Sequence, residues 1–88
     1  MVVFKSRFKK ELKAIFDYIS LDSESRAYDF INALFDKFQL IEQSPYAFRK
    51  SLSFNDENIR DFIYKGYVIP YLIDNDIVLI LGIYKENI

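Results

Sequence analysis

Three polar residues near the end of the sequence, Tyr84, Lys85 and Glu86, are of types that can take part in phosphodiester cleavage. A tyrosine hydroxyl can protonate a leaving oxygen, a lysine can contact a phosphate, and a glutamate can accept a proton. Two further basic residues, Arg60 and Lys65, lie on a predicted strand and could stabilise charge on the phosphate. The candidate catalytic residues for RNA cleavage through the 2′-hydroxyl are therefore Arg60, Lys65, Tyr84 and Lys85. The Tyr-Lys-Glu run is too common to be a motif by itself.

The composition excludes several other kinds of site. The 88 residues include no Cys and no His, which excludes a disulfide scaffold, a thiol nucleophile, a zinc finger and histidine acid-base chemistry. The acidic turns at 56–57 and 74–76 fit turn chemistry better than a cation site, because the set of possible ligands is incomplete. We therefore expect no metal and no other cofactor.

The apolar runs of the sequence are short. None approaches the roughly 20 residues that span a bilayer, and the apolar stretch at the start is too short for a signal peptide. The absence of Cys indicates a reducing compartment. We expect a single cytoplasmic domain over residues 1–88 with no membrane contact.

The charge of the chain is nearly balanced, with a formal net charge of -1. It divides unevenly, at +3 in residues 1–20, -3 in residues 21–48 and -1 in residues 49–88. Proteins that contact several phosphates normally carry an excess of Lys and Arg, so we expect no sequence-specific DNA binding by this chain alone. The basic N-terminal region could meet an acidic partner, although a solvated helix face is the more common explanation.

Hydrophobic periodicity predicts the elements that position these residues. An apolar run predicts a strand at 2–4, and apolar residues three and four apart predict helices at 6–20 and 24–43. Asp22 or Ser23 can cap the second helix, and Pro45 disfavours helical backbone in the residue before it. The short connection between the helices makes them an antiparallel hairpin.

The second half of the sequence has the pattern of strands separated by polar turns. The predicted strands are 48–54, 59–65, 67–73 and 77–84, with turns at 55–58 and 74–76. Tight turns between consecutive strands indicate an antiparallel meander. The predicted fold class is α+β, with an N-terminal strand and a two-helix hairpin packed on an antiparallel sheet as a two-layer sandwich.

Several motifs follow one another in a specific order. They are "LKAIFDYI" at 12–19, "S...A..FI..L" from Ser23 to Leu34, "L.EQSP" from Leu40 to Pro45, "IR" at 59–60, "GY.I.Y.I" at 66–73 and "IVLILGI" at 77–83. In this order the chain resembles the RelE/ParE superfamily of toxins from bacterial toxin-antitoxin operons. The segment from Ser23 to Pro45 is closer to the ParE branch.

The resemblance implies two kinds of partner. A cognate antitoxin would hold the toxin inactive, with a tail that wraps around the toxin along its sheet and helices. Free toxins of the ParE branch inhibit DNA gyrase, whereas those of the RelE branch cleave messenger RNA in the ribosomal A site. A non-toxic relative that acts as a binding module is a third possibility.

Departures from the RelE pattern favour a protein target. RelE-like enzymes use Lys and Arg clustered on the sheet and a Tyr or His near the C-terminus. Where many relatives carry Arg after the tyrosine of "GY", this chain has Val68, and its strand half has a net charge of -1. We therefore favour an inhibitor of a protein target, with the ribosome-dependent ribonuclease as the alternative.

A proline interrupts the predicted strand 67–73. Pro70 cannot donate a ladder hydrogen bond, so the sequence predicts a bulge or a missing bond there. Alternation places Tyr67, Ile69, Tyr71 and Ile73 beneath the helices, and the remaining residues on an open, apolar face. The predicted partner-binding residues are Val68, Pro70, Leu72, Arg49 and Arg60. Arg60 could also hold the fold together, or form a surface pair with Asp61.

Overall fold

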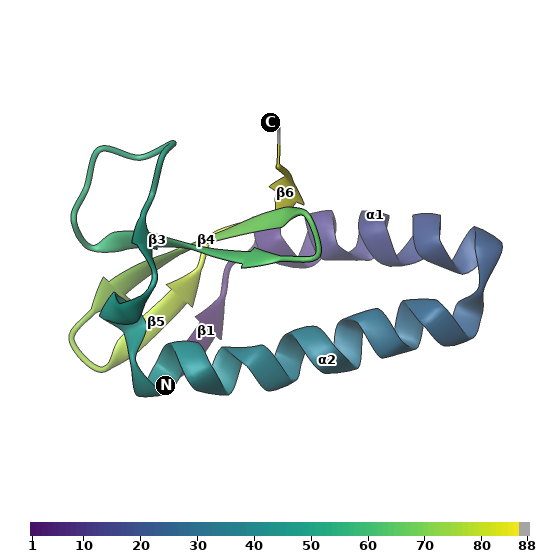
Figure 1. Cartoon of the computed structure of the whole chain (residues 1–88), viewed down its shortest axis with the longest axis horizontal. Helices are drawn as coiled ribbons and strands as arrows, with labels where there is room; N and C mark the ends of the chain where they lie inside the picture. Colours follow the sequence, from purple (N-terminus) through teal and green to yellow (C-terminus); the bar gives the residue numbers. More distant parts are fainter. Residues whose placement is uncertain (87–88) are drawn as a thin grey trace.

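The structure is a computed structural model that describes residues 1–86. Its elements are β1 (Val2–Phe4), α1 (Ser6–Asp22), α2 (Glu24–Gln43), a short 3-10 helix (Pro45–Ala47), β2 (Arg49–Lys50), β3 (Ile59–Tyr64), β4 (Tyr67–Asp74), β5 (Ile77–Ile80) and β6 (Tyr84–Lys85). The two helices run antiparallel and extend beyond one end of the sheet (Figure 1). The predicted α+β fold, with a helical hairpin on one face of the sheet, is confirmed.

The sheet has the strand order β1-β5-β4-β3-β2. The neighbours β2, β3, β4 and β5 pair antiparallel, as the meander requires, while β1 pairs parallel to β5. The final strand β6 pairs with β4 beyond the end of β5. The N-terminal strand therefore lies at an edge of the sheet, beside a strand almost eighty residues later in the chain.

A single residue connects the two helices. Ser23 is extended, and its side chain accepts a hydrogen bond from the backbone N–H of Arg26 at 3.2 Å. This bond satisfies one of the free donors at the start of α2. Of the two predicted caps, Ser23 is the one that forms, and α1 continues two residues beyond its predicted end.

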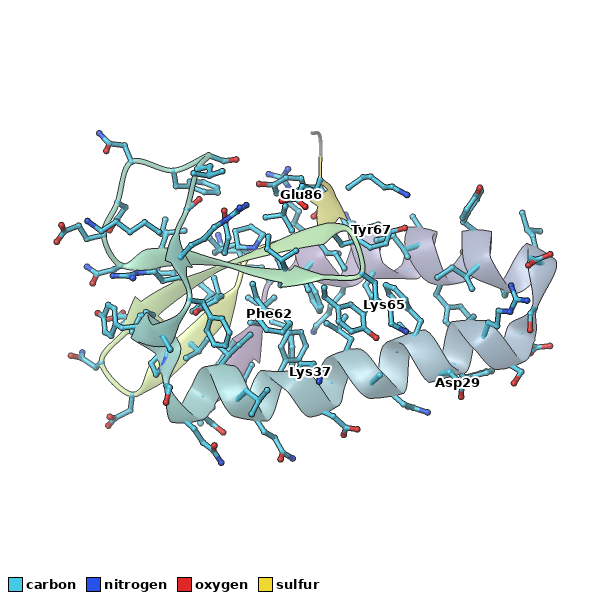
Figure 2. All side chains as sticks on the ribbon, in the orientation of Figure 1. Asp29, Lys37, Phe62, Lys65, Tyr67 and Glu86 are labelled. Atoms are coloured by element: carbon cyan, nitrogen blue, oxygen red, sulfur yellow. The ribbon has the colours of Figure 1, made fainter. Side chains whose placement is uncertain are left out.

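The core lies between the helices and the sheet. Its buried residues are Phe8, Leu12, Phe30, Leu34, Phe38, Ile41, Phe62, Tyr64, Ile69, Tyr71, Ile73, Val78, Ile80 and Ile83. Figure 2 shows Phe62 pointing from the sheet toward α2. As predicted, Ile69, Tyr71 and Ile73 face the helices, and the ring of Tyr67 lies 5.6 Å from that of Phe30. Apolar alternation on β4 therefore identified the buried face correctly.

The predicted strand 48–54 is wrong in its second half, where only Arg49 and Lys50 form β2. The Ser51 hydroxyl accepts hydrogen bonds from the N–H groups of Ser53 and Phe54 at 3.2 and 3.1 Å. These local bonds compete with a strand ladder. The chain consequently leaves the sheet after Ser51 and returns at Ile59.

The predicted strand 77–84 is interrupted by a bulge opposite Pro70. Tyr71 pairs with Ile80, and Val68 pairs with Tyr84. Between these two pairs β4 spans three residues, whereas the opposite segment spans four. Leu81 donates its N–H to the carbonyl of Pro70 at 2.9 Å. The nitrogen of Pro70 points to the same edge of β4 as its carbonyl, so the missing donor faces the bulge. Pairing with β3 continues across Pro70, so β4 itself has no bulge, and the extra residue lies in the partner segment 81–83.

A carboxylate from α1 holds the bulged segment 81–83. Glu11 accepts the backbone N–H of Ile83 at 3.1 Å. A Cβ atom on Gly82 would lie 2.6 Å from the same carboxylate oxygen. Glycine therefore leaves room for the Glu11 carboxylate at this position.

Two properties of the described residues bear on function. None of the helices in residues 1–86 is long and apolar enough to cross a membrane. Across the same residues, no group of three or more acidic side chains is placed to hold a metal ion.

Candidate functional site

The face of the sheet opposite the helices is partly covered, which corrects one prediction. Val68 is 2% exposed and Pro70 is also buried, so these two residues do not form an open surface. Residues 51–58 fold back over this face, with Leu52 and Ser53 beside Val68, and Phe54 beside Pro70. The predicted open apolar face is wrong at these two positions, and only Leu72 is partly exposed.

A buried carboxylate lies beneath the returning segment. The side chain of Asp61 is completely buried, and its Oδ2 atom is 3.3 Å from the guanidinium of Arg49. The same oxygen accepts the N–H of Leu52 at 3.2 Å, while Oδ1 has no partner among the described residues. Arg49 also lies 3.6 Å from Glu86. Two carboxylates therefore neutralise this arginine, which leaves it poorly suited to hold a phosphate.

Arg60 points to the opposite side of β3 and does not pair with Asp61. Its guanidinium donates to the carbonyls of Glu57, Tyr46 and Phe48 at 3.1, 3.4 and 3.1 Å. It also lies over the ring of Tyr46, 5.0 Å from the centroid. The predicted surface pair of Arg60 with Asp61 is wrong. Arg60 instead stabilises the segment between α2 and β2 through hydrogen bonds to its backbone carbonyls.

The remaining candidate residues lie at the opposite end of the β3–β4 hairpin. Lys65 occupies the turn with φ of 49°, and its Nζ lies 5.5 Å from the centroid of the Tyr64 ring. Lys85 lies over the ring of Tyr67 at 5.4 Å. Figure 2 shows Lys65 and Tyr67 together at this end of the hairpin. Tyr84 is within hydrogen-bond distance of Ser53, 2.9 Å between the hydroxyls.

The four candidate catalytic residues do not share a centre. Arg60 and Lys65 are five residues apart along β3, which is roughly 16 Å at about 3.3 Å per residue. Tyr84 pairs with Val68 and Lys85 pairs with Tyr67, so their side chains leave opposite faces of the sheet. No single phosphate could contact the whole set.

Two buried tyrosines are structural. Tyr71 donates its hydroxyl to the carbonyl of Pro45 at 2.6 Å, and Tyr64 donates to the carbonyl of Phe30 at 2.9 Å. Burial raises the pKa of both tyrosines. At Tyr71 the positive charge of Arg60 opposes this rise in pKa and the negative charge of Asp61 adds to it. These hydroxyls remain protonated at neutral pH.

An apolar groove between the helices is a site that motif analysis missed. Its volume is about 440 Å³, and its lining residues are Phe4, Phe8, Lys9, Leu12, Lys13, Phe16, Tyr28, Ile31 and Phe35. Tyr28 is 54% exposed and Phe35 is 40% exposed. Hydrophobic periodicity assigns apolar helix residues of this kind to the core. The sequence feature that could have indicated the groove was the apolar stripe of α2, which is wider than one neighbouring element can cover.

The rim of this helical groove carries two lysines, one of which is paired with a carboxylate. Lys9 has no ion-pair partner within residues 1–86, and Lys13 pairs with Asp17 at 2.8 Å. Exposed apolar surface bordered by charge is typical of a site that binds another protein. The groove therefore suits a segment that is apolar on one side and acidic at its edge.

Comparison with known proteins identifies the family. No curated protein matches the sequence significantly. The fold is similar to a structure described as the chromosomal ParDE TA system from P. aeruginosa, with a TM-score of 0.78, 15% sequence identity, and coverage of 98% of this chain and 95% of that chain. A family model described as the ParE toxin of the type II toxin-antitoxin system, parDE, matches residues 2–87. These findings confirm the predicted superfamily and its ParE branch. Because the family match spans nearly the whole sequence, this chain belongs to the ParE toxin family of type II toxin-antitoxin systems.

Proposed function

We propose that this protein is a cytoplasmic toxin that an antitoxin, encoded beside it, holds inactive, and that the free toxin inhibits DNA gyrase. The observation that supports a protein target over RNA is that, among residues 1–86, neither arginine on the sheet is free to hold a phosphate. Arg49 is neutralised by Asp61 and Glu86, and Arg60 is occupied by three backbone carbonyls. A nuclease needs such groups for the charge on the reacting phosphate.

The helical groove supports binding of an antitoxin tail. Its apolar floor fits the apolar side of an amphipathic segment, a common way for a groove to bind a partner helix. Lys9 and Lys13 at its rim favour a segment with acidic residues along its edge. An antitoxin bound there would lie between α1 and α2, on the helical side of the molecule.

A supercoiling assay tests the proposed target directly. Purified toxin is added to DNA gyrase and relaxed plasmid, and the toxin concentration that halves supercoiling is measured. We expect inhibition by the free toxin and recovery when antitoxin is added in equal amount. Normal supercoiling in an excess of folded toxin would reject gyrase as the target.

A double variant tests the ribonuclease alternative. We expect Tyr84→Phe with Lys85→Ala to arrest growth as strongly as the wild type, because Tyr84 and Lys85 leave opposite faces of the sheet and Arg60 lies at the far end of the hairpin. Growth after induced expression is the measurement, and circular dichroism checks the fold. Loss of arrest in the folded variant, together with codon-dependent cuts in translated messages, would favour ribosome-dependent cleavage. Normal growth with soluble wild-type protein would instead favour a non-toxic binding module.

A further inference from the structure

One half of the sheet surface opposite the helices is not covered by the returning segment. Cross-strand pairing places Val3, Leu79 and Leu72 side by side on this face, across β1, β5 and β4. Ile77 lies two residues before Leu79 on the same face. Val3 is 36% exposed and Ile77 is 41% exposed, while Leu72 and Leu79 are partly exposed.

Two more apolar residues extend this surface toward the bulge. Leu81 lies beside Phe54, which is 40% exposed. We call the resulting patch the open sheet face, and its residues are Val3, Phe54, Leu72, Ile77, Leu79 and Leu81. These side chains come from three strands, the loop after β2 and the segment after β5, so the patch is a continuous surface and not one stray residue.

The open sheet face has an acidic border. Asp74 is exposed, and it lies directly opposite Ile77 on the same face. Asp76 is in the adjoining turn. The backbone carbonyl of Asn58 accepts the N–H of Ile73, which places Asp56, two residues before Asn58, at the same end of the sheet. None of these three carboxylates has an ion-pair partner within residues 1–86. The N-terminal ammonium donates to the backbone carbonyl of Asp76 at 2.8 Å, and Arg7 lies beside Phe54 and Leu81 at the other end, so the acidic border is confined to the end near the β4–β5 turn. At that end the charge is opposite to that of Lys9 and Lys13 at the helical groove.

Opposite charges at two apolar surfaces select chemically different partners. A segment with acidic edges would be attracted to Lys9 and Lys13 and repelled by Asp56, Asp74 and Asp76. We propose that the open sheet face binds the protein target of the toxin, through a target surface with an apolar centre and a basic border. This inference rests on the proposed function in taking the molecule to be a toxin, but it does not require gyrase to be the target.

The experiment compares two pairs of charge variants in the full-length protein. In the first, Asp74→Asn and Asp76→Asn remove the acidic border but keep residues that suit turns. In the second, Lys9→Glu and Lys13→Glu reverse the rim of the helical groove. Growth arrest, half-inhibition of gyrase and affinity for antitoxin are measured for each, and thermal unfolding checks the fold. A third variant, Ile77→Lys, tests the apolar part of the face.

We expect the first pair and Ile77→Lys to weaken growth arrest and inhibition about tenfold or more, with antitoxin affinity within about twofold of wild type. The second pair should show the reverse pattern. The inference would be overturned if the folded variants of the first pair and Ile77→Lys both kept the growth arrest and gyrase inhibition of the wild type. That result would leave the proposed function intact. If wild-type toxin does not inhibit gyrase but the first pair still loses growth arrest, the inference stands and gyrase is rejected. A wild-type protein that causes no growth arrest would overturn both.

Discussion

At the scale of single residues, the sheet surface opposite the helices is organised around one buried charge. Asp61 has no exposed side-chain area and depends on Arg49 and on the N–H of Leu52. A buried carboxylate that loses its cation is much more costly than a surface ion pair. The stability of this region therefore depends on an arginine that sequence analysis had assigned to partner binding.

Substitution of that arginine tests its structural role. We expect Arg49→Met to lower the free energy of unfolding by about 2 kcal/mol or more, because Asp61 keeps its burial and loses its partner. Urea denaturation gives the value. Adding Asp61→Asn should recover part of the loss, since the amide is neutral. Unchanged stability in Arg49→Met would mean that the pair contributes little.

The raised pKa of Tyr71 gives a prediction at alkaline pH. In the unfolded chain a tyrosine ionises near pH 10, whereas in the folded protein burial keeps Tyr71 protonated to higher pH. The unfolded state therefore holds fewer protons above pH 10, and the free energy of unfolding falls by up to about 1.4 kcal/mol per pH unit. Below pH 10 this contribution is fully present.

Denaturation curves from pH 9 to 11.5 measure this slope. Tyr71→Phe should be less stable at neutral pH, since it loses the bond to Pro45, but its stability should fall less steeply above pH 10. Tyr18→Phe is the matched control, because Tyr18 is 74% exposed. Equal slopes in Tyr71→Phe and wild type would show that Tyr71 ionises freely in the folded protein.

At the scale of elements, helix α1 and the bulge between β5 and β6 form one unit. Glu11 satisfies the N–H of Ile83, and Gly82 leaves room for that carboxylate. The bulge lies where Pro70 offers no donor, so the sheet loses one ladder bond and gains a contact from the helix. The helix consequently holds the segment that connects β5 to β6.

A double-mutant cycle measures this coupling. We expect Gly82→Ala to cost about 1 to 2 kcal/mol, because the added methyl group displaces Glu11 and leaves the Ile83 N–H without its acceptor. In the background of Glu11→Ala the same change should cost less, since the obstructing carboxylate is gone. Chemical denaturation of the four proteins gives the interaction energy. Additive costs would show that the two residues are independent.

Sequence patterns predicted some elements much better than others, for identifiable physical reasons. Long apolar periodicity fixed both helices, and alternation fixed the buried face of β4. The end of β2 depends on two local bonds to the Ser51 hydroxyl, which leave no periodic signal. The burial of Asp61 could not be predicted either, because its partners Arg49 and Leu52 come from a segment that had been assigned to a straight strand.

At the scale of the whole molecule, two apolar surfaces lie on separate sides of the two-layer fold. The helical groove is formed by β1, α1 and α2, and the open sheet face by β1, β4, β5 and the loop after β2. Each surface combines exposed apolar residues with charged residues at its border, Asp56, Asp74 and Asp76 at one end of the open sheet face and Lys9 and Lys13 at the groove. This arrangement is consistent with one small protein that meets two partners through different surfaces.

Substitutions in the helical groove test the proposal that it binds the antitoxin. We expect Phe35→Ser and Tyr28→Ser each to weaken binding of the antitoxin tail roughly tenfold or more, because exposed aromatic residues in grooves commonly dominate binding. Calorimetric titration measures the affinity. Tyr18→Ser is the control, since this exposed tyrosine lies outside the groove. Equal affinities for the three variants and wild type would show that the tail binds elsewhere.

The parallel pairing of β1 with β5 also decides when these surfaces can be completed during translation. The groove is lined by residues 4–35, whereas the open sheet face needs Leu72, Ile77, Leu79 and Leu81. Domains are synthesised from the N-terminus, and contacts between distant residues form only after both are available. Both surfaces include residues of β1, which pairs with β5, so neither is complete until residues 77–80 have been synthesised. A nascent chain with this topology therefore completes the surface proposed for the antitoxin and the surface proposed for the target together.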